Sequence, residues 1–202
     1  ELTPPYSLFS SKNYSTLSED EKYQWIEYHK WKFSGAWYTQ LVGDLVLSSK
    51  MRFGFLGYYN NEIGTTPFER FYLGGDGLSG YNNLDGREII ALRGYTNESI
   101  LPEYFADKTI GGSIYSKYTL ELRFPLSLNP NATIYALGFL EGGNSWNKFA
   151  KFNPFNVYKS AGLGMRIFLP MFGILGLDWG YGMDPVPGNA SANGGQFHFS
   201  IN

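Results

Sequence analysis

The chain has 202 residues, of which 18% are aromatic, and it contains 25 glycines and no cysteine. This length accommodates one or two domains, and the absence of cysteine excludes disulfides, thiolate nucleophiles and cysteine-ligated zinc sites. A formal net charge of −2 without a long basic run argues against a nucleic-acid partner, because phosphate binding needs a positive field.

The hydropathy of the chain leaves two classes of β protein open. No run of about eighteen apolar residues occurs, so a transmembrane helix is not expected. The mean hydropathy is slightly negative, which is ordinary for a soluble protein. A transmembrane β-barrel has a similar mean, because its lipid-facing and lumen-facing residues alternate and average out.

Apolar side chains alternate with polar or small ones along most of the chain, as in half-buried strands. In the stretch YTLELRFPL, Leu120 and Leu122 share one face while Glu121 and Arg123 share the other. The alternation predicts eight strands, near residues 1–9, 24–41, 44–60, 113–127, 132–146, 157–170, 173–184 and 195–202. Pro4 and Pro5 count against the first of these strands, because proline cannot donate to a ladder.

The expected connections alternate between short and long. The turns near residues 42–44, 129–131 and 172–173 are short, whereas the loops at 10–23, 61–112, 147–156 and 185–194 are longer. Short turns on one rim and long loops on the other are typical of an outer-membrane barrel. Aromatic residues near the expected strand ends fit interfacial belts; they are Trp25, Tyr28, Tyr58, Tyr59, Trp146 and Tyr158.

A soluble antiparallel sandwich or barrel would also show alternation. Two features favour the membrane barrel. The face opposite the apolar one is rich in glycine and carries few charges, whereas a sandwich has a broadly charged outer face. Several strands are also longer than the usual five or six residues, and they approach the length that crosses a bilayer.

The long loop indicates that the barrel is larger than this chain. Eight strands could close into a small barrel, but its interior would be just filled by side chains. A loop of about fifty residues at 61–112 would not fit inside so narrow a tube. We therefore expect an all-β, antiparallel transmembrane barrel in which residues 1–202 form the C-terminal half and the other strands lie upstream.

Four blocks of sequence resemble the BamA family of outer-membrane β-barrel assembly insertases. They are LRGY (92–95) in the long loop, FLEGGNSW (139–146), GLGMRIFLPMFGILGLDWGYGMD (162–184) and a terminal aromatic strand, in this order. The resemblance covers essentially the whole chain. It implies a complete barrel of sixteen strands in the bacterial outer membrane, with no enzyme activity, no cofactor and no metal.

The resemblance also implies a site inside the barrel. In this superfamily the arginine loop folds back into the lumen, and its arginine contacts the acidic residue of a phenylalanine-x-aspartate pattern. Phe139 and Glu141 occupy the matching positions here, with glutamate in place of the commoner aspartate. The alternation independently puts these two residues on one face. Arg93 would then fasten a loop that has no hydrophobic core of its own, because a guanidinium has five donors in a rigid fork. Gly94 allows close backbone approach and Tyr95 adds a flat face with a polar tip.

The family further implies that the first and last strands form a weak seam, to which a client strand adds. The last strand here consists of Gly195, Gln196, Phe197, His198, Phe199, Ser200 and Ile201. The implied partners are membrane lipid including lipopolysaccharide, the upstream half of the barrel, periplasmic domains, accessory assembly lipoproteins and unfolded outer-membrane clients. His29 and His198 lie on different expected strands without cysteine, so neither a metal site nor a catalytic triad is expected.

Two alternatives from other functional classes stay open. A transporter of the same superfamily, such as a two-partner secretion channel, would share the arginine loop but would need a conducting lumen. An independent eight-stranded outer-membrane barrel, acting as an adhesin or a structural protein, would not need upstream strands.

Overall fold

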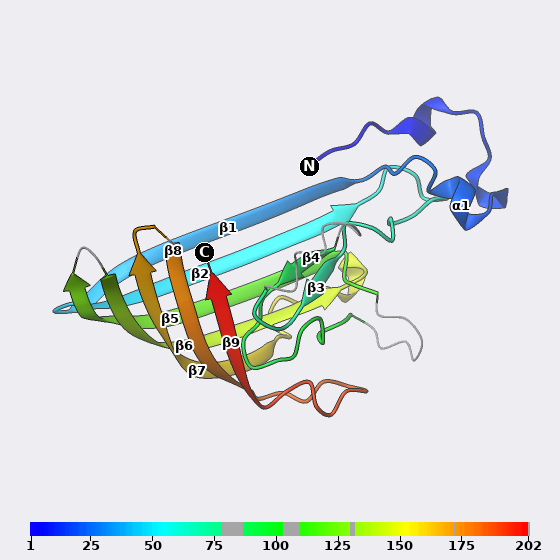
Figure 1. Cartoon of the computed structure of the whole chain (residues 1–202). Helices are drawn as coiled ribbons and strands as arrows, with labels where there is room; N and C mark the ends of the chain where they lie inside the picture. The colour runs from blue at the N-terminus through cyan, green and yellow to red at the C-terminus, as the bar shows by residue number, and fades with distance from the viewer. Residues whose placement is uncertain (78–86, 103–109, 130–131, 172, 202) are drawn as a thin grey trace.

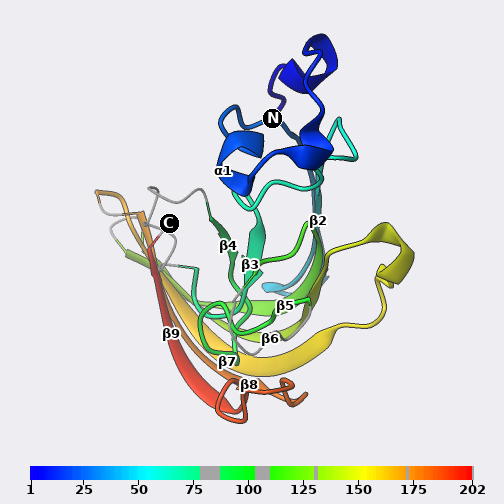
Figure 2. The ribbon, with the colours of Figure 1, turned by 90° about the vertical axis from the view of Figure 1, so that its right-hand side faces the viewer.

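Seven long strands form one antiparallel sheet in the computed structural model, which describes residues 1–77, 87–102, 110–129, 132–171 and 173–201. The spatial order is β1-β2-β5-β6-β7-β8-β9 (Figure 1). The strands are β1 (His29–Val42), β2 (Leu45–Gly57), β5 (Ile114–Asn129), β6 (Ala132–Trp146), β7 (Tyr158–Leu169), β8 (Gly173–Gly182) and β9 (Gly195–Ile201). Within the described residues β1 and β9 lie at opposite ends of the sheet, which curves into an open trough (Figure 2).

The strand expected at residues 1–9 is wrong, so the sheet has seven strands and not eight. Leu2 makes one isolated bridge to His29, and the chain then forms the 3-10 helices η1 (Tyr6–Phe9) and η2 (Tyr14–Thr16). The prolines at positions 4 and 5 explain the break, because neither has an N–H for a ladder.

A short helix, α1 (Glu19–Lys22), precedes the first long strand. Ser18 and Glu21 form a capping box at its N-terminus. The strand expected from residue 24 therefore begins only at His29. In the described part of the chain, no helix is long and apolar enough to cross a membrane.

The two faces of the sheet differ as the alternation predicted. Apolar side chains cover the convex face, where Leu177 is 50% exposed, while Asp178 beside it on the concave face is 5% exposed. Leu120, Leu122 and Trp179 share the convex face. The period of two is thus confirmed along the central strands.

The described part of the loop at 61–112 reaches into the trough of the sheet (Figure 2). It contains β3 (Phe71–Leu73) and β4 (Glu88–Ile90), which pair in parallel. Residues 78–86 and 103–109 of this loop lie outside the described part, as do residues 130–131 and 172 in two of the expected short turns and Asn202 at the end of the last expected strand.

The expectation that this loop has no hydrophobic core is wrong. The loop buries several apolar side chains against the sheet, together with two from the connection between β8 and β9. These core residues are Phe71, Leu73, Ile90, Leu92, Tyr95 and Ile100 of the loop, Leu56 and Tyr115 of the sheet, and Val186 and Ala192 of the connection. Hydrophobic burial therefore contributes to docking the loop alongside any polar contact.

The aromatic belt is only partly as expected. Trp146 is 6% exposed because the connection after β6, which contains η4 (Phe149–Lys151), places Phe152 with its ring centroid 4.9 Å from that of Trp146. Tyr28 and Tyr158 pack against the core of the loop. Trp25 and Tyr58 are exposed.

Candidate functional site

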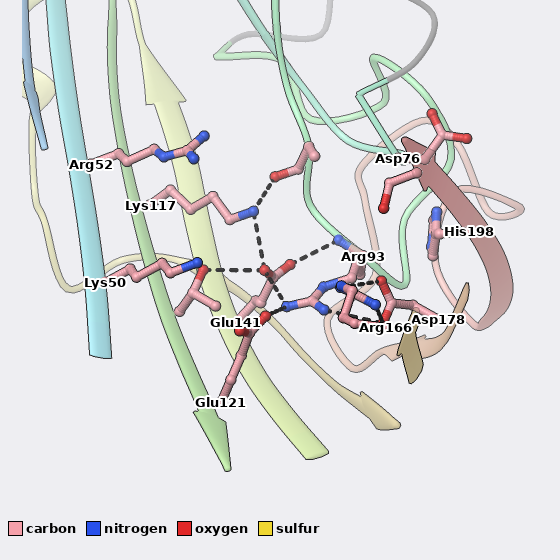
Figure 3. Close-up of a pocket in the computed structure, with 13 residues that line it drawn as sticks. Lys50, Arg52, Asp76, Arg93, Lys117, Glu121, Glu141, Arg166, Asp178 and His198 are labelled. Carbon is pink, nitrogen blue, oxygen red and sulfur yellow. Dashed lines mark hydrogen bonds and ion pairs between the residues drawn. The ribbon is translucent and has the colours of Figure 1, made fainter. Parts of the chain in front are cut away.

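Arg93 occupies a buried position on the concave side of the sheet (Figure 3). Its Nη2 lies 2.8 Å from Glu141 Oε1 on β6 and 2.9 Å from Glu121 Oε1 on β5. Its Nη1 lies 3.3 Å from Asp178 Oδ1 on β8. The backbone N–H of Arg93 also donates to Glu141 Oε2, at 3.0 Å. One guanidinium therefore joins the loop to three strands, and its contact with Glu141 is direct.

Phe139 forms the floor under this guanidinium. The guanidinium carbon lies 3.6 Å from the centroid of the phenyl ring, in a cation–π contact. A Cβ at Gly162 on β7 would lie 2.5 Å from the tip of the ring, so this strand needs glycine there. The glycine-rich inner face thus makes room for the ring on which Arg93 rests.

Each of the three carboxylates also has a second cation. Lys117 Nζ lies 3.1 Å from Glu141 Oε1 and donates to the carbonyl of Ala91 in the loop. Arg123 donates to Glu121, with its Nε at 3.0 Å. Arg166 holds Asp178 in a bidentate pair, with both bonds at 2.8 Å. Such additional hydrogen bonds offset the cost of burying these charges.

Gly94 is required by both its backbone angle and its surroundings. Its φ is 88°, and a Cβ at this position would lie 2.6 Å from the backbone nitrogen of Gly182 on β8. Its N–H donates to Nε2 of His198 on β9, at 2.8 Å. The backbone of the loop therefore lies directly on the last two strands.

Tyr95 completes this segment, and we call Arg93, Gly94 and Tyr95 the latch motif. The ring of Tyr95 is fully buried. The Tyr95 hydroxyl donates to the carbonyl of Lys159 at 2.7 Å and accepts from the N–H of Asp184 at 3.2 Å. Burial raises the pKa of Tyr95 to about 12, so its hydroxyl stays protonated and available as a donor.

A cavity of about 210 Å³ adjoins the latch motif and is lined mainly by charged side chains. No group of three or more metal-ligating side chains occurs in the described residues. The arrangement of fixed, paired charges can hold a loop against the sheet by electrostatics and hydrogen bonds.

The structure brings together Arg93, Phe139 and Glu141, the residues that the family resemblance pointed to. It adds Glu121 and Asp178, which sequence reasoning missed as partners. Glu121 lies opposite Phe139 in the β5–β6 register. The alternation along β5 puts Glu121 on the inner face, and this was the signal in the sequence that Glu121 could reach Arg93.

Of the expected seam residues, His198 contacts the latch motif. Its neighbours Phe197, Phe199 and Ile201 lie on the convex face and are exposed, Phe197 at 86%. Gly195, Gln196 and Ser200 complete β9, which pairs with β8.

Comparison with protein families gives one match across most of the chain. The model of the Omp85 superfamily domain matches residues 14–202. A comparison with curated proteins finds no match.

Proposed function

Because the chain belongs to the Omp85 superfamily, we propose that it is the C-terminal part of a sixteen-stranded barrel that folds and inserts client β-barrels into the bacterial outer membrane. Proteins of this superfamily insert or transport proteins at the outer membranes of bacteria or organelles. The partners we propose are membrane lipid including lipopolysaccharide, the upstream half of the barrel with periplasmic domains, accessory lipoproteins and unfolded clients.

The convex face of the sheet supports a position in a bilayer. It presents apolar side chains from every long strand, among them Phe33, Leu120, Leu163 and Leu177. In a chain of this size, so continuous an apolar surface needs a nonpolar environment to cover it. Strands of up to 16 residues are long enough to span the hydrocarbon region when tilted.

The observation that carries the insertase proposal is the last strand. Within the described chain β9 pairs with β8, and its other edge is open. A strand that pairs on one side only presents unpaired N–H and C=O groups on the other, so a seam formed at this edge can template the addition of a client strand.

The two alternatives make different demands on this architecture. A two-partner secretion channel would share the latch motif but would conduct ions, which planar-bilayer recordings of the complete protein would detect. An independent eight-stranded barrel would need its first and last strands to pair, whereas β1 and β9 lie at opposite ends of the sheet.

A reversible disulfide across the seam tests the proposal. In the complete protein in liposomes, Phe199→Cys in β9 is combined with a cysteine at the facing position of the first strand of the complete barrel, which lies upstream of this chain. Oxidation should abolish client assembly and reduction should restore it. A tethered protein that still assembles clients at the untethered rate would refute a role for the seam.

The register provides a matched control. Leu177 on β8 lies opposite Phe199. The pair Leu177→Cys and Phe199→Cys therefore uses the same cysteine in β9 but locks it to its inner neighbour. This second tether leaves the seam free, and client assembly should survive oxidation.

A further inference from the structure

The last strand receives contacts from the long loop as well as from β8. His198 lies on the concave face of β9, opposite Asp178 in the register, and is almost fully buried. Its Nε2 accepts the N–H of Gly94 at 2.8 Å. Figure 3 shows His198 on the far side of Arg93 from Lys117, next to the loop.

The segment leading into β9 also pairs with the loop. The N–H of Thr96 donates to the carbonyl of Ala192 at 2.8 Å, and Tyr95 forms an isolated bridge with Asn193. Two residues further along, the carbonyl of Gly194 accepts from the N–H of Gly182 at 3.0 Å. The latch motif and its neighbour therefore contact both the entry to β9 and its middle.

We propose that His198 is a positioning residue that couples docking of the latch motif to the placement of the last strand. This inference rests on the proposed function of β9 as a seam strand. A strand at the edge of a sheet is held by one ladder, so a second attachment through Gly94 changes how readily it separates. By linkage, a docked loop stabilises β9 and a correctly placed β9 stabilises the docked loop to the same extent.

The chemistry of the contact defines which side chains can make it. The N–H of Gly94 needs an acceptor, and the imidazole supplies one when Nε2 carries no proton. An amide oxygen at the same position can also accept, whereas a leucine of similar size cannot. Replacement by glutamine or leucine therefore separates the hydrogen bond from the volume of the side chain.

Hydrogen exchange of the complete protein in liposomes at pH 8 measures the coupling. His198→Leu should raise amide exchange by about 3- to 10-fold, the effect of losing one hydrogen bond, in residues 195–201 and around the latch motif. His198→Gln should stay near the wild-type rates in both segments. Gln196→Leu, on the same face of β9, is the matched control and should leave the latch motif protected.

Three results would overturn the coupling: unchanged exchange in His198→Leu, an effect confined to one of the two segments, or a glutamine variant as exposed as the leucine variant. Arg93→Ala leaves the sequence of β9 unchanged and provides a second test of the coupling if the leucine variant does not fold. It should raise exchange in residues 195–201, and unchanged protection there would equally refute the inference.

Client assembly measured on the same variants separates this inference from the proposed function. Raised exchange in both segments with a wild-type assembly rate would sustain the coupling and contradict the insertase role of the seam. Slowed assembly with unchanged exchange would contradict the coupling alone.

Discussion

Replacing Arg93 by alanine removes a guanidinium that lies 2.8–3.3 Å from three carboxylates, those of Glu121, Glu141 and Asp178. Breaking a buried pair costs about 3–5 kcal/mol when it leaves a charge unpaired. Each carboxylate here keeps a second cation, so we expect a loss at the lower end, about 3 kcal/mol of loop-docking free energy. That corresponds to roughly a hundredfold rise in the undocked population.

Glu141→Ala should be the more damaging change. It removes the carboxylate that pairs with Lys117 and with the guanidinium of Arg93. The backbone N–H of Arg93 also loses its acceptor. The cations Arg93, Lys117, Arg123 and Arg166 would then face two carboxylates in place of three. We expect a loss near the upper end, about 5 kcal/mol. The double variant should cost clearly less than the sum, because removing Arg93 relieves part of the excess positive charge.

Limited chymotrypsin digestion of the complete protein in liposomes checks this order, with the rate of cleavage in the loop as the measure of undocking. Lys50→Ala is the control, because Lys50 lines the same cavity but is not a partner in the ion pairs that join Arg93 to Glu121, Glu141 and Asp178. Strictly additive losses, or wild-type protection in Arg93→Ala, would show that the loop is held by its apolar core and not by the charge cluster.

Three further substitutions test other parts of the account. Leu177→Arg on the convex face should cost roughly 2–4 kcal/mol of folding stability if the site lies near the bilayer midplane, and an unchanged urea midpoint for folding in vesicles would place it away from lipid. Gly94→Ala should undock the loop, because φ is 88° and the added Cβ would lie 2.6 Å from a strand nitrogen. Gly43→Ala is its control, because Gly43 has a φ of 56° but open space around it. That variant therefore shows the effect of backbone strain alone, about 1–2 kcal/mol. Equal protease sensitivity of these two variants would refute the close approach. Lys30→Met should loosen the part of the loop that contains β3 and β4, because the buried ammonium of Lys30 lies 3.0 Å from Glu69 and 2.7 Å from Glu88. Lys32→Met should have the smaller effect in the same digestion assay, because the side chain of Lys32 is 42% exposed.

Local alternation predicted the long strands and their two faces, because the side-chain period of a strand needs no knowledge of its neighbours. The same alternation places Glu141 on the inner face without knowledge of its contact with Arg93. Alternation alone is misleading at residues 1–9, because Pro4 and Pro5 have no N–H to donate and the chain forms 3-10 helices after one isolated bridge.

Contacts between distant segments could not be predicted in this way. Leu73 and Ile100 bury the loop together with Val186, but the three residues follow no common period. Glu121 and Asp178 meet Arg93 only through the register of the sheet, which the sequence of one strand does not determine. The acceptor role of His198 depends on where the loop backbone passes.

Photo-crosslinking during assembly tests the central claim most directly. A photoreactive residue replaces Phe199 of β9 in the complete protein, and a matched one replaces Leu120 of β5, since these positions on the convex face are 41% and 45% exposed. If the last strand is the seam at which clients add, a client arrested during assembly should crosslink at position 199 and not at position 120. Equal crosslinking at both positions, or none at position 199, would contradict the proposed insertase function.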